Sequence, residues 1–101
     1  MKPLFFHKDA EEELEEAARR YEREREGLGL RFQAEVERVT ATIQRNPQMW
    51  PKHKSTNLRK SLLRKFPYTI FYLEQDDCIW IAAVAHQKRR PGYWMARTPE
   101  D

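Results

Sequence analysis

Two amphipathic segments separated by a short glycine-containing break constrain the fold of this chain most. Apolar residues at helical spacing predict a first helix over about Asp9–Arg25. A second apolar stripe predicts a helix that starts near Leu30 and ends at Asn46-Pro47. Because only Gly27-Leu28-Gly29 breaks the pattern between them, the two helices are expected to form an antiparallel hairpin. The residues of the two stripes are Ala10, Leu14, Ala17, Ala18 and Tyr21, then Phe32, Val36, Val39 and Ile43.

The start of the first helix carries a capping pattern. Asp9 is expected at the N-cap, and Glu12 follows three residues later, as in a capping box. The acidic run that follows suits the positive end of the helix dipole. On the outer face, Glu15→Arg19 and Glu16→Arg20 have the spacing of helical ion pairs, so this charge run is interpreted as a solvated surface.

Four short runs predict β-strands, one before the two helices and three after them. Pro3 places the first strand at an edge or at a strand start. Tight reversals are expected at Phe66-Pro67 and over Glu74–Asp77. The predicted strands are Lys2–His7, Leu58–Phe66, Tyr68–Leu73 and Cys78–His86.

The element order predicts an α+β fold, β-α-α-β-β-β, with the helical hairpin packed on a mostly antiparallel sheet. We expect a single domain over residues 1–101, with a basic and then polar C-terminal tail over 87–101. The opposite face of the sheet is expected to be lined partly by the basic strand Leu58–Phe66 and by this tail. A concave basic sheet face is therefore a candidate site.

Charge is segregated along the chain. Residues 1–50 have nine Lys/Arg and eleven Asp/Glu, whereas residues 51–101 have ten and five. Between Pro51 and Leu73 there are six basic residues and no acidic one. Such a one-signed surface favours a polyanion or an acidic partner. The alternative is a solvated basic face that serves solubility, although solubility alone does not require segregation.

Other classes of protein are disfavoured by what the chain lacks. Cys78 is the only cysteine, which excludes an internal disulfide; it is expected to be a small buried hydrophobe in a cytosolic protein. No secretory h-region follows Met1, and no apolar run has the length of a membrane span. The histidines lie far apart, so neither a metal site nor a cofactor is expected.

Three stretches and the element order together resemble RelE/ParE-type toxins, and most closely those called plasmid stabilisation proteins. The stretches are N-P-x-x-W-P at Asn46–Pro51, L-R-K-S-L-L-R-K-F-P-Y-x-I-F-Y at Leu58–Tyr72 and A-V-A-H-Q-K-R-R-P-G-Y-W at Ala83–Trp94. The resemblance runs from Leu4 to Trp94. It implies a bacterial toxin of a type II toxin–antitoxin pair that inhibits growth and is neutralised by an antitoxin protein with an acidic or amphipathic tail.

The resemblance implies two activities on one fold. ParE-type members poison DNA gyrase and so block replication, without a catalytic set of residues. RelE-type members are ribosome-dependent mRNA endoribonucleases that work without a metal. Because one fold carries both activities, the fold does not choose between them, and whether the chain is an enzyme stays open. A third alternative is a degenerate member that only binds its antitoxin or nucleic acid.

The nuclease alternative assigns catalytic roles to His86, Arg64 and Tyr93. His86 ends the last predicted strand, where some nuclease members keep a catalytic histidine, and its pKa range suits acid–base work. Tyr93 could supply a phenol or stack a base. The chain departs from nuclease members in having Pro67 and Tyr68 where they place an arginine. Gln87 likewise stands where some of them place a tyrosine. These departures and the likeness to plasmid stabilisation proteins favour the gyrase alternative.

Two sets of basic residues are candidate contact residues. Trp94 is expected mainly to pack, and His86 has a structural alternative as a strand-end residue that hydrogen-bonds the tail. The candidates for phosphate or nucleic-acid binding are Lys52, Lys54, Lys65, Lys88, Arg89 and Arg90. The candidates for antitoxin binding are Arg59, Lys60, Arg64 and Lys65.

Overall fold

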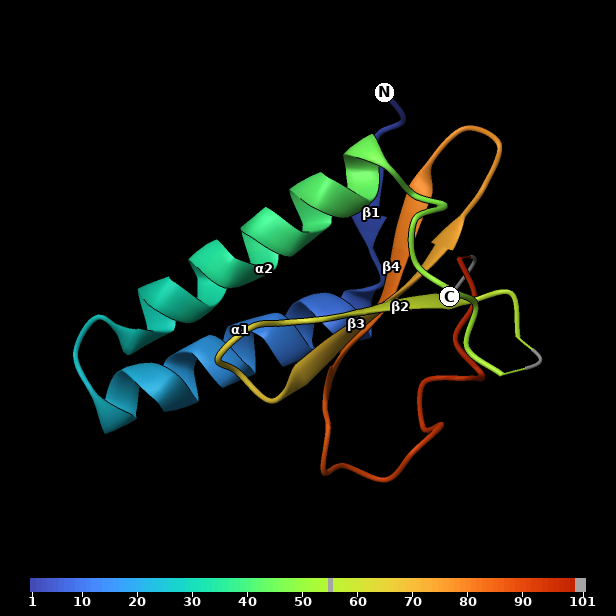
Figure 1. The fold of residues 1–101 in the computed structure, drawn as a ribbon. Coiled ribbons are helices and arrows are strands. Elements are labelled where there is room, and N and C mark those ends of the chain that lie inside the picture. The colour runs from blue at the N-terminus through green and yellow to red at the C-terminus, as the bar shows by residue number, and fades with distance from the viewer. Residues whose placement is uncertain (55, 100–101) are drawn as a thin grey trace.

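The two helices form the predicted antiparallel hairpin in the computed structural model, which describes residues 1–54 and 56–99 (Figure 1). Helix α1 spans Lys8–Glu24 and α2 spans Leu28–Arg45. The predicted stripes face the interior, because Ala10, Phe32 and Ile43 are fully buried. The helical periodicity of the sequence thus predicted both elements.

The turn between the helices is tighter than predicted. Gly27 is the N-cap of α2 with a left-handed φ of 86°, and Gly29 lies inside the helix instead of breaking it. The Glu22 carboxylate accepts hydrogen bonds from the Gly27 and Gly29 amides at 2.9 and 3.0 Å, so α1 caps α2. A Cβ atom on Gly29 would lie 2.5 Å from the Ala18 carbonyl oxygen, so only glycine fits this crossing.

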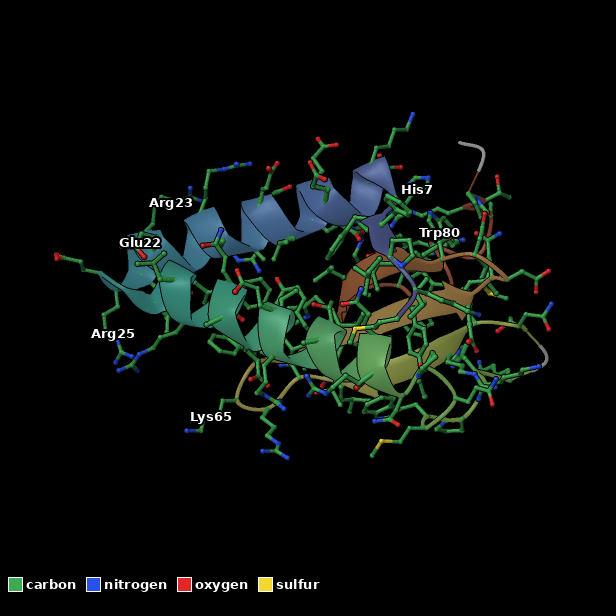
Figure 2. The ribbon with its side chains drawn as sticks, turned by 90° about the horizontal axis from the view of Figure 1, so that it is seen from above. His7, Glu22, Arg23, Arg25, Lys65 and Trp80 are labelled. Atoms are coloured by element: carbon green, nitrogen blue, oxygen red, sulfur yellow. The ribbon has the colours of Figure 1, made fainter. Side chains whose placement is uncertain are left out.

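The cap of α1 differs from the prediction. His7, not Asp9, is the N-cap, and its Nδ1 accepts a hydrogen bond from the Asp9 amide at 3.0 Å. Asp9 and Glu12 therefore lie inside the helix, and the predicted capping box does not form. The His7 ring is buried and meets the Trp80 ring edge-on, with centroids 5.7 Å apart (Figure 2). This packing explains why a histidine takes the capping position.

The sheet contains four strands in the order β1-β4-β3-β2. Strands β2, β3 and β4 are antiparallel neighbours, whereas β1 pairs in parallel with β4. The α+β class and the mostly antiparallel sheet are confirmed. The strands are β1 (Leu4–Phe6), β2 (Arg59–Leu62), β3 (Tyr68–Glu74) and β4 (Ile79–His86).

Three strand predictions were too long. The first strand, predicted over Lys2–His7, covers only Leu4–Phe6. The strand predicted over Leu58–Phe66 ends at Leu62, because the chain then turns through Lys65, whose φ of 68° is left-handed. Cys78 lies in the turn before β4 and is only half-buried, so the prediction of a buried hydrophobe was wrong. Its thiol contacts the Gln75 side-chain oxygen at 3.1 Å.

The helices cover one face of the sheet, and the C-terminal segment lies against the other face (Figure 1). The main core joins Phe32 and Ile43 of the helices to Ile70, Tyr72 and Ile81 of the sheet. The opposite face carries a second apolar cluster and is not a basic surface as expected; the charges lie at its margin. The last two residues of the predicted tail, 100 and 101, lie outside the described residues.

Neither helix is long and apolar enough to cross a membrane, within the part of the chain that the structure describes.

Candidate functional site

A groove of about 240 Å³ lies on the sheet face that is opposite the helices. We call it the sheet-face groove. Its floor comes from β3 and β4, and its walls come from the loop before β2 and from the C-terminal segment. Its main lining residues are His53, Lys54, Phe71, Ala85, His86, Arg89, Arg90, Tyr93 and Trp94.

Aromatic packing holds the walls of this groove in place. The Trp94 ring is 3% exposed and stacks on Phe71 with centroids 3.8 Å apart, which confirms its expected packing role. His53 meets both rings edge-on, each at 5.3 Å. Burial, and then the charges of Lys60 and Lys54, lower the pKa of His53. His53 is therefore a neutral ring at neutral pH.

The Glu13 carboxylate of α1 holds the C-terminal segment to the body of the protein. It accepts a hydrogen bond from the Tyr93 hydroxyl at 2.5 Å and two from the Arg97 guanidinium at 3.0 and 3.1 Å. It also accepts one from the Val84 amide at 3.0 Å, while Arg97 donates to the Ala82 carbonyl at 2.9 Å. The Glu13–Arg97 pair thus satisfies the edge of β4 where β1 has ended.

Tyr93 is committed to this network. Burial, and then its hydrogen bond to Glu13, raise the pKa of Tyr93 well above its usual range. The Arg89 guanidinium lies over the Tyr93 ring at 3.8 Å from the centroid, and 3.6 Å from the Glu13 carboxylate. A phenol held in this way is a poor proton donor and its ring face is already covered.

A β-bulge decides which way His86 points. Phe71 pairs with Ala83 and Tyr72 pairs with Ile81, so Ala82 is the extra residue of β4. Alternation beyond the bulge puts His86 on the side of Val84, which belongs to the helix-side core. The His86 ring accordingly meets the Tyr68 ring edge-on at 5.1 Å. Its Nδ1 accepts the Lys88 amide hydrogen at 3.0 Å, as the structural alternative predicted.

Arg64 lies away from the other two proposed catalytic residues. It is exposed on the turn between β2 and β3, where its amide donates to Glu35 of α2 at 2.6 Å. Its side chain lines a hollow that contains neither His86 nor Tyr93. The structure therefore does not bring His86, Arg64 and Tyr93 together into one constellation.

The predicted phosphate-binding residues divide between several places. Lys54, Arg89 and Arg90 line the sheet-face groove. Lys88 is exposed just after β4, and Lys52 is exposed where its backbone bridges to Arg59. Lys65 lies with Arg64 on the distant β2–β3 turn.

The predicted antitoxin-binding residues also separate. Arg59 is drawn inward, because its guanidinium donates to the Trp50 carbonyl at 2.6 Å. Lys60 lies half-buried on β2 close to His53. Arg64 and Lys65 form a second basic group on the turn.

Sequence reasoning missed two residues of this region. Glu13 was included in the solvated acidic run, yet it lies three residues after Ala10 and four before Ala17, on the apolar stripe. A carboxylate at such a position signals a partner that reaches it from elsewhere. The sequence pattern did not single out His53. Its place after Trp50-Pro51 gave no signal of contact with Trp94.

The described lining of the groove combines cations with the His53, His86 and Tyr93 side chains, each of which is already held by a neighbouring contact. Among residues 1–54 and 56–99, no group of His, Cys, Asp or Glu side chains could hold a metal ion. The arrangement suits contact with an anionic or carboxylate-bearing surface more than a chemical step.

The fold and this arrangement define a scaffold of the RelE/ParE toxin superfamily, with a helical hairpin on one sheet face and a C-terminal segment on the other. The chain belongs to the family described as the ParE toxin of type II toxin–antitoxin systems, parDE, which matches residues 4–91. No curated protein sequence matches the chain significantly.

A solved structure shares the fold. A chain of the structure titled "Chromosomal ParDE TA system from P. aeruginosa" is similar, with a TM-score of 0.75 and 15% sequence identity. The match covers 85% of this chain and 96% of that one. At this identity the likeness establishes the fold and leaves the contact residues to be argued from this chain.

Proposed function

We propose that this chain is a ParE-like toxin that inhibits DNA gyrase and is neutralised by a cognate antitoxin. Membership of the ParE toxin family supports the toxin role and the antitoxin partner. The gyrase target is argued from the geometry of the candidate site.

The observation that carries the proposal is the separation of the acid–base candidates. His86 and Tyr93 both line the sheet-face groove, but the His86 ring packs on Tyr68 and the Tyr93 hydroxyl is bonded to Glu13. Arg64 lies on another hollow, which contains neither of them. Metal-free RNA cleavage needs a base, an acid and cations around one phosphate. A toxin that acts by binding an enzyme needs only a firm scaffold with exposed contact residues.

The sheet-face groove supplies such contacts. Exposed Lys54 and Arg90 lie at its margin, and the stacking of Trp94 from the wall on Phe71 of the floor makes it rigid. The hydrogen bonds of Glu13 fix the segment that carries Arg89 and Arg90, so their positions are set before a partner arrives.

Purified gyrase tests the proposal. The chain should inhibit supercoiling of relaxed plasmid or trap cleaved DNA. Lys54→Ala with Arg90→Ala should weaken this effect at least about tenfold if the groove margin makes the contact. Arg19→Ala with Arg23→Ala, which removes two exposed charges from the outer part of α1, is the matched control. Equal potency of the groove variant and the wild type would exclude the groove as the contact.

The nuclease alternative is tested in parallel with programmed ribosomes. Cleavage of mRNA in the decoding site, lost in both His86→Ala and Arg64→Ala, would replace the gyrase proposal. If the same preparation of the chain also left the supercoiling activity of gyrase unchanged, the nuclease activity would be the only one of the two that it has.

A further inference from the structure

Strand β1 forms one edge of the sheet, because only β4 pairs with it in the part of the chain that the structure describes. The parallel pairing decides which of its backbone groups are used. The Pro3 carbonyl accepts from a β4 amide and the His7 amide donates to the Ile81 carbonyl, both at 2.9 Å. Alternate residues of a strand direct their backbone groups to opposite sides, so those of Leu4 and Phe6 point away from the sheet.

The outer edge of β1 is not used within the described chain. No residue in the ranges 1–54 and 56–99 forms a hydrogen bond with the outward backbone groups of Leu4 or Phe6. A row of unpaired N–H and C=O groups is a template for pairing with another strand.

The features that usually protect a strand edge do not protect this one. Edge strands of monomers commonly carry a lysine or a proline that interferes with pairing. The Lys2 ammonium group is held by its own chain, because it donates to the Glu74 carboxylate at 3.0 Å and to the Gln75 carbonyl at 2.7 Å. Pro3 belongs to the residues that face β4, so its ring removes no donor from the outer edge.

Phe5, the middle residue of β1, presents an exposed aromatic ring at this edge. Its neighbours Leu4 and Phe6 pack against the helix-side core, so alternation directs Phe5 to the opposite face of the sheet. There its side chain is 56% exposed, whereas Trp80, its register partner in β4, is 5% exposed. The Phe5 ring is therefore placed to pair with an aromatic side chain of a strand that is added at the edge.

We propose that β1 pairs with β1 of a second copy of this chain, antiparallel and centred on Phe5. In this register Leu4 of each copy exchanges both of its backbone hydrogen bonds with Phe6 of the other copy, so each outward group finds a partner. The two Phe5 residues form the closely spaced, non-hydrogen-bonded pair at the twofold axis, with both rings on one face. A second copy is the occupant because the edge is complementary to itself under this rotation.

The twofold axis of such a pair stands perpendicular to the sheet. Both helical hairpins therefore lie on one face of the joined sheet, and both sheet-face grooves lie on the other. Because β1 has only three residues, the contact is small, and we expect a dissociation constant on the order of 0.1 mM. This inference goes beyond the proposed function and does not depend on it, since a monomer retains the whole sheet-face groove.

Sedimentation velocity of the full chain tests the association. We expect mostly monomer at about 0.02 mM and mostly dimer at about 1 mM. Phe5→Glu places like charges opposite each other at the axis and should keep the chain monomeric at about 1 mM. Leu30→Glu, at a side chain of α2 that is 70% exposed, is the matched control and should dimerise as the wild type does.

Amide hydrogen exchange of the wild-type chain tests the register without any variant. The Leu4 and Phe6 amides should exchange at least about twofold more slowly at 1 mM than at 0.05 mM, because the dimer protects them. The Phe5 amide faces β4 in both states and should change less. The inference is overturned if the chain stays monomeric at about 1 mM, or if the two glutamate variants associate equally. A dimer without slower exchange at Leu4 and Phe6 would also overturn it.

Discussion

The Glu13 carboxylate accepts hydrogen bonds from a strand edge, a tyrosine hydroxyl and an arginine that lies 84 residues further along the chain. Both Glu13 and Arg97 have side chains that are nearly buried, at 12% and 13% exposed. Buried charge pairs are costly to break from one side, because the remaining charge has no partner. Glu13 is therefore one of the residues that hold the C-terminal segment in position.

Glu13→Gln should loosen the C-terminal segment. The neutral amide offers weaker acceptors to Arg97, so we expect a loss of about 1–3 kcal/mol in the free energy of unfolding. Faster hydrogen exchange of the Val84 amide should accompany it, measured by mass spectrometry. Glu12→Gln, one residue away and exposed, is the control. Unchanged exchange at Val84 would show that the Glu13 contacts contribute little.

Gly29→Ala should destabilise the hairpin, although alanine is the better helix former. The added Cβ would meet the Ala18 carbonyl oxygen at 2.5 Å and force the helices apart. We expect about 1–3 kcal/mol lower stability in urea unfolding. Leu30→Ala, at a neighbouring side chain that is 70% exposed, should change stability little. A stabilised Gly29→Ala variant would contradict the close crossing.

The residue scale is where sequence reasoning was weakest. Asp9 fits the statistics of N-caps, yet His7 takes that place because its ring is also needed against Trp80. Asp9 and Glu13 belong to the same acidic run. Only contacts with distant residues distinguish the Glu13 carboxylate, which holds the C-terminal segment, from the solvated carboxylates of the run. Local pattern carries no information on a partner that lies far away in the sequence.

Among the elements, the C-terminal segment has no helix or strand over its described residues, 87–99, and its contact with the sheet face comes from Trp94. Trp94→Ala should release the segment from the sheet face and lower the stability by about 3 kcal/mol. Limited proteolysis with trypsin should then cut after Lys88 or Arg89. Met95→Ala, at a side chain that is 52% exposed, is the control and should retain the wild-type cleavage rate. Equal cleavage of the two variants would refute this role.

Acid should weaken the docking of the β2–β3 turn on α2. The hydrogen bonds from Arg38, and then the Arg64 amide, lower the pKa of Glu35. The unfolded chain therefore takes up this proton first, and the stabilisation that is present at neutral pH is lost as the pH falls. Lys2 lowers the pKa of Glu74 with the same consequence.

The free energy of unfolding should accordingly decrease as the pH is lowered from neutral into the range in which carboxylates usually titrate. Glu35→Gln should make the free energy of unfolding depend less on pH. Urea unfolding at several pH values measures it. Glu37→Gln changes an exposed carboxylate on the same helix and is the control. An identical pH dependence in wild type and Glu35→Gln would contradict the assignment.

The elements themselves were largely predictable, because helical stripes and β-rich runs are local patterns. The end of β2 was not, since Lys65 takes a left-handed φ where a lysine gives no warning. The parallel pairing of β1 with β4 joins residues from the two ends of the chain. Only the packing of the whole protein decides such a pairing.

At the scale of the whole molecule, candidate residues that belong to one proposed catalytic set in the sequence lie in different parts of the structure. His86 and Tyr93 both line the sheet-face groove, but the bulge at Ala82 turns the His86 ring toward Tyr68, and the Tyr93 hydroxyl is held by Glu13. Arg64 lies in a different hollow. The family and its fold followed from motifs spread over the chain. The composition of the site depended on one extra residue in a strand, which no local pattern revealed.

A pulse of expression of this chain without an antitoxin tests the central claim most directly, when translation and gyrase-dependent DNA breaks are measured in the same cells. We predict continued translation in the first minutes, together with an SOS response and DNA breaks that require gyrase. Rapid loss of translation, with codon-phased mRNA cuts and intact DNA, would contradict the account. It would show that the target of the chain is mRNA on the ribosome.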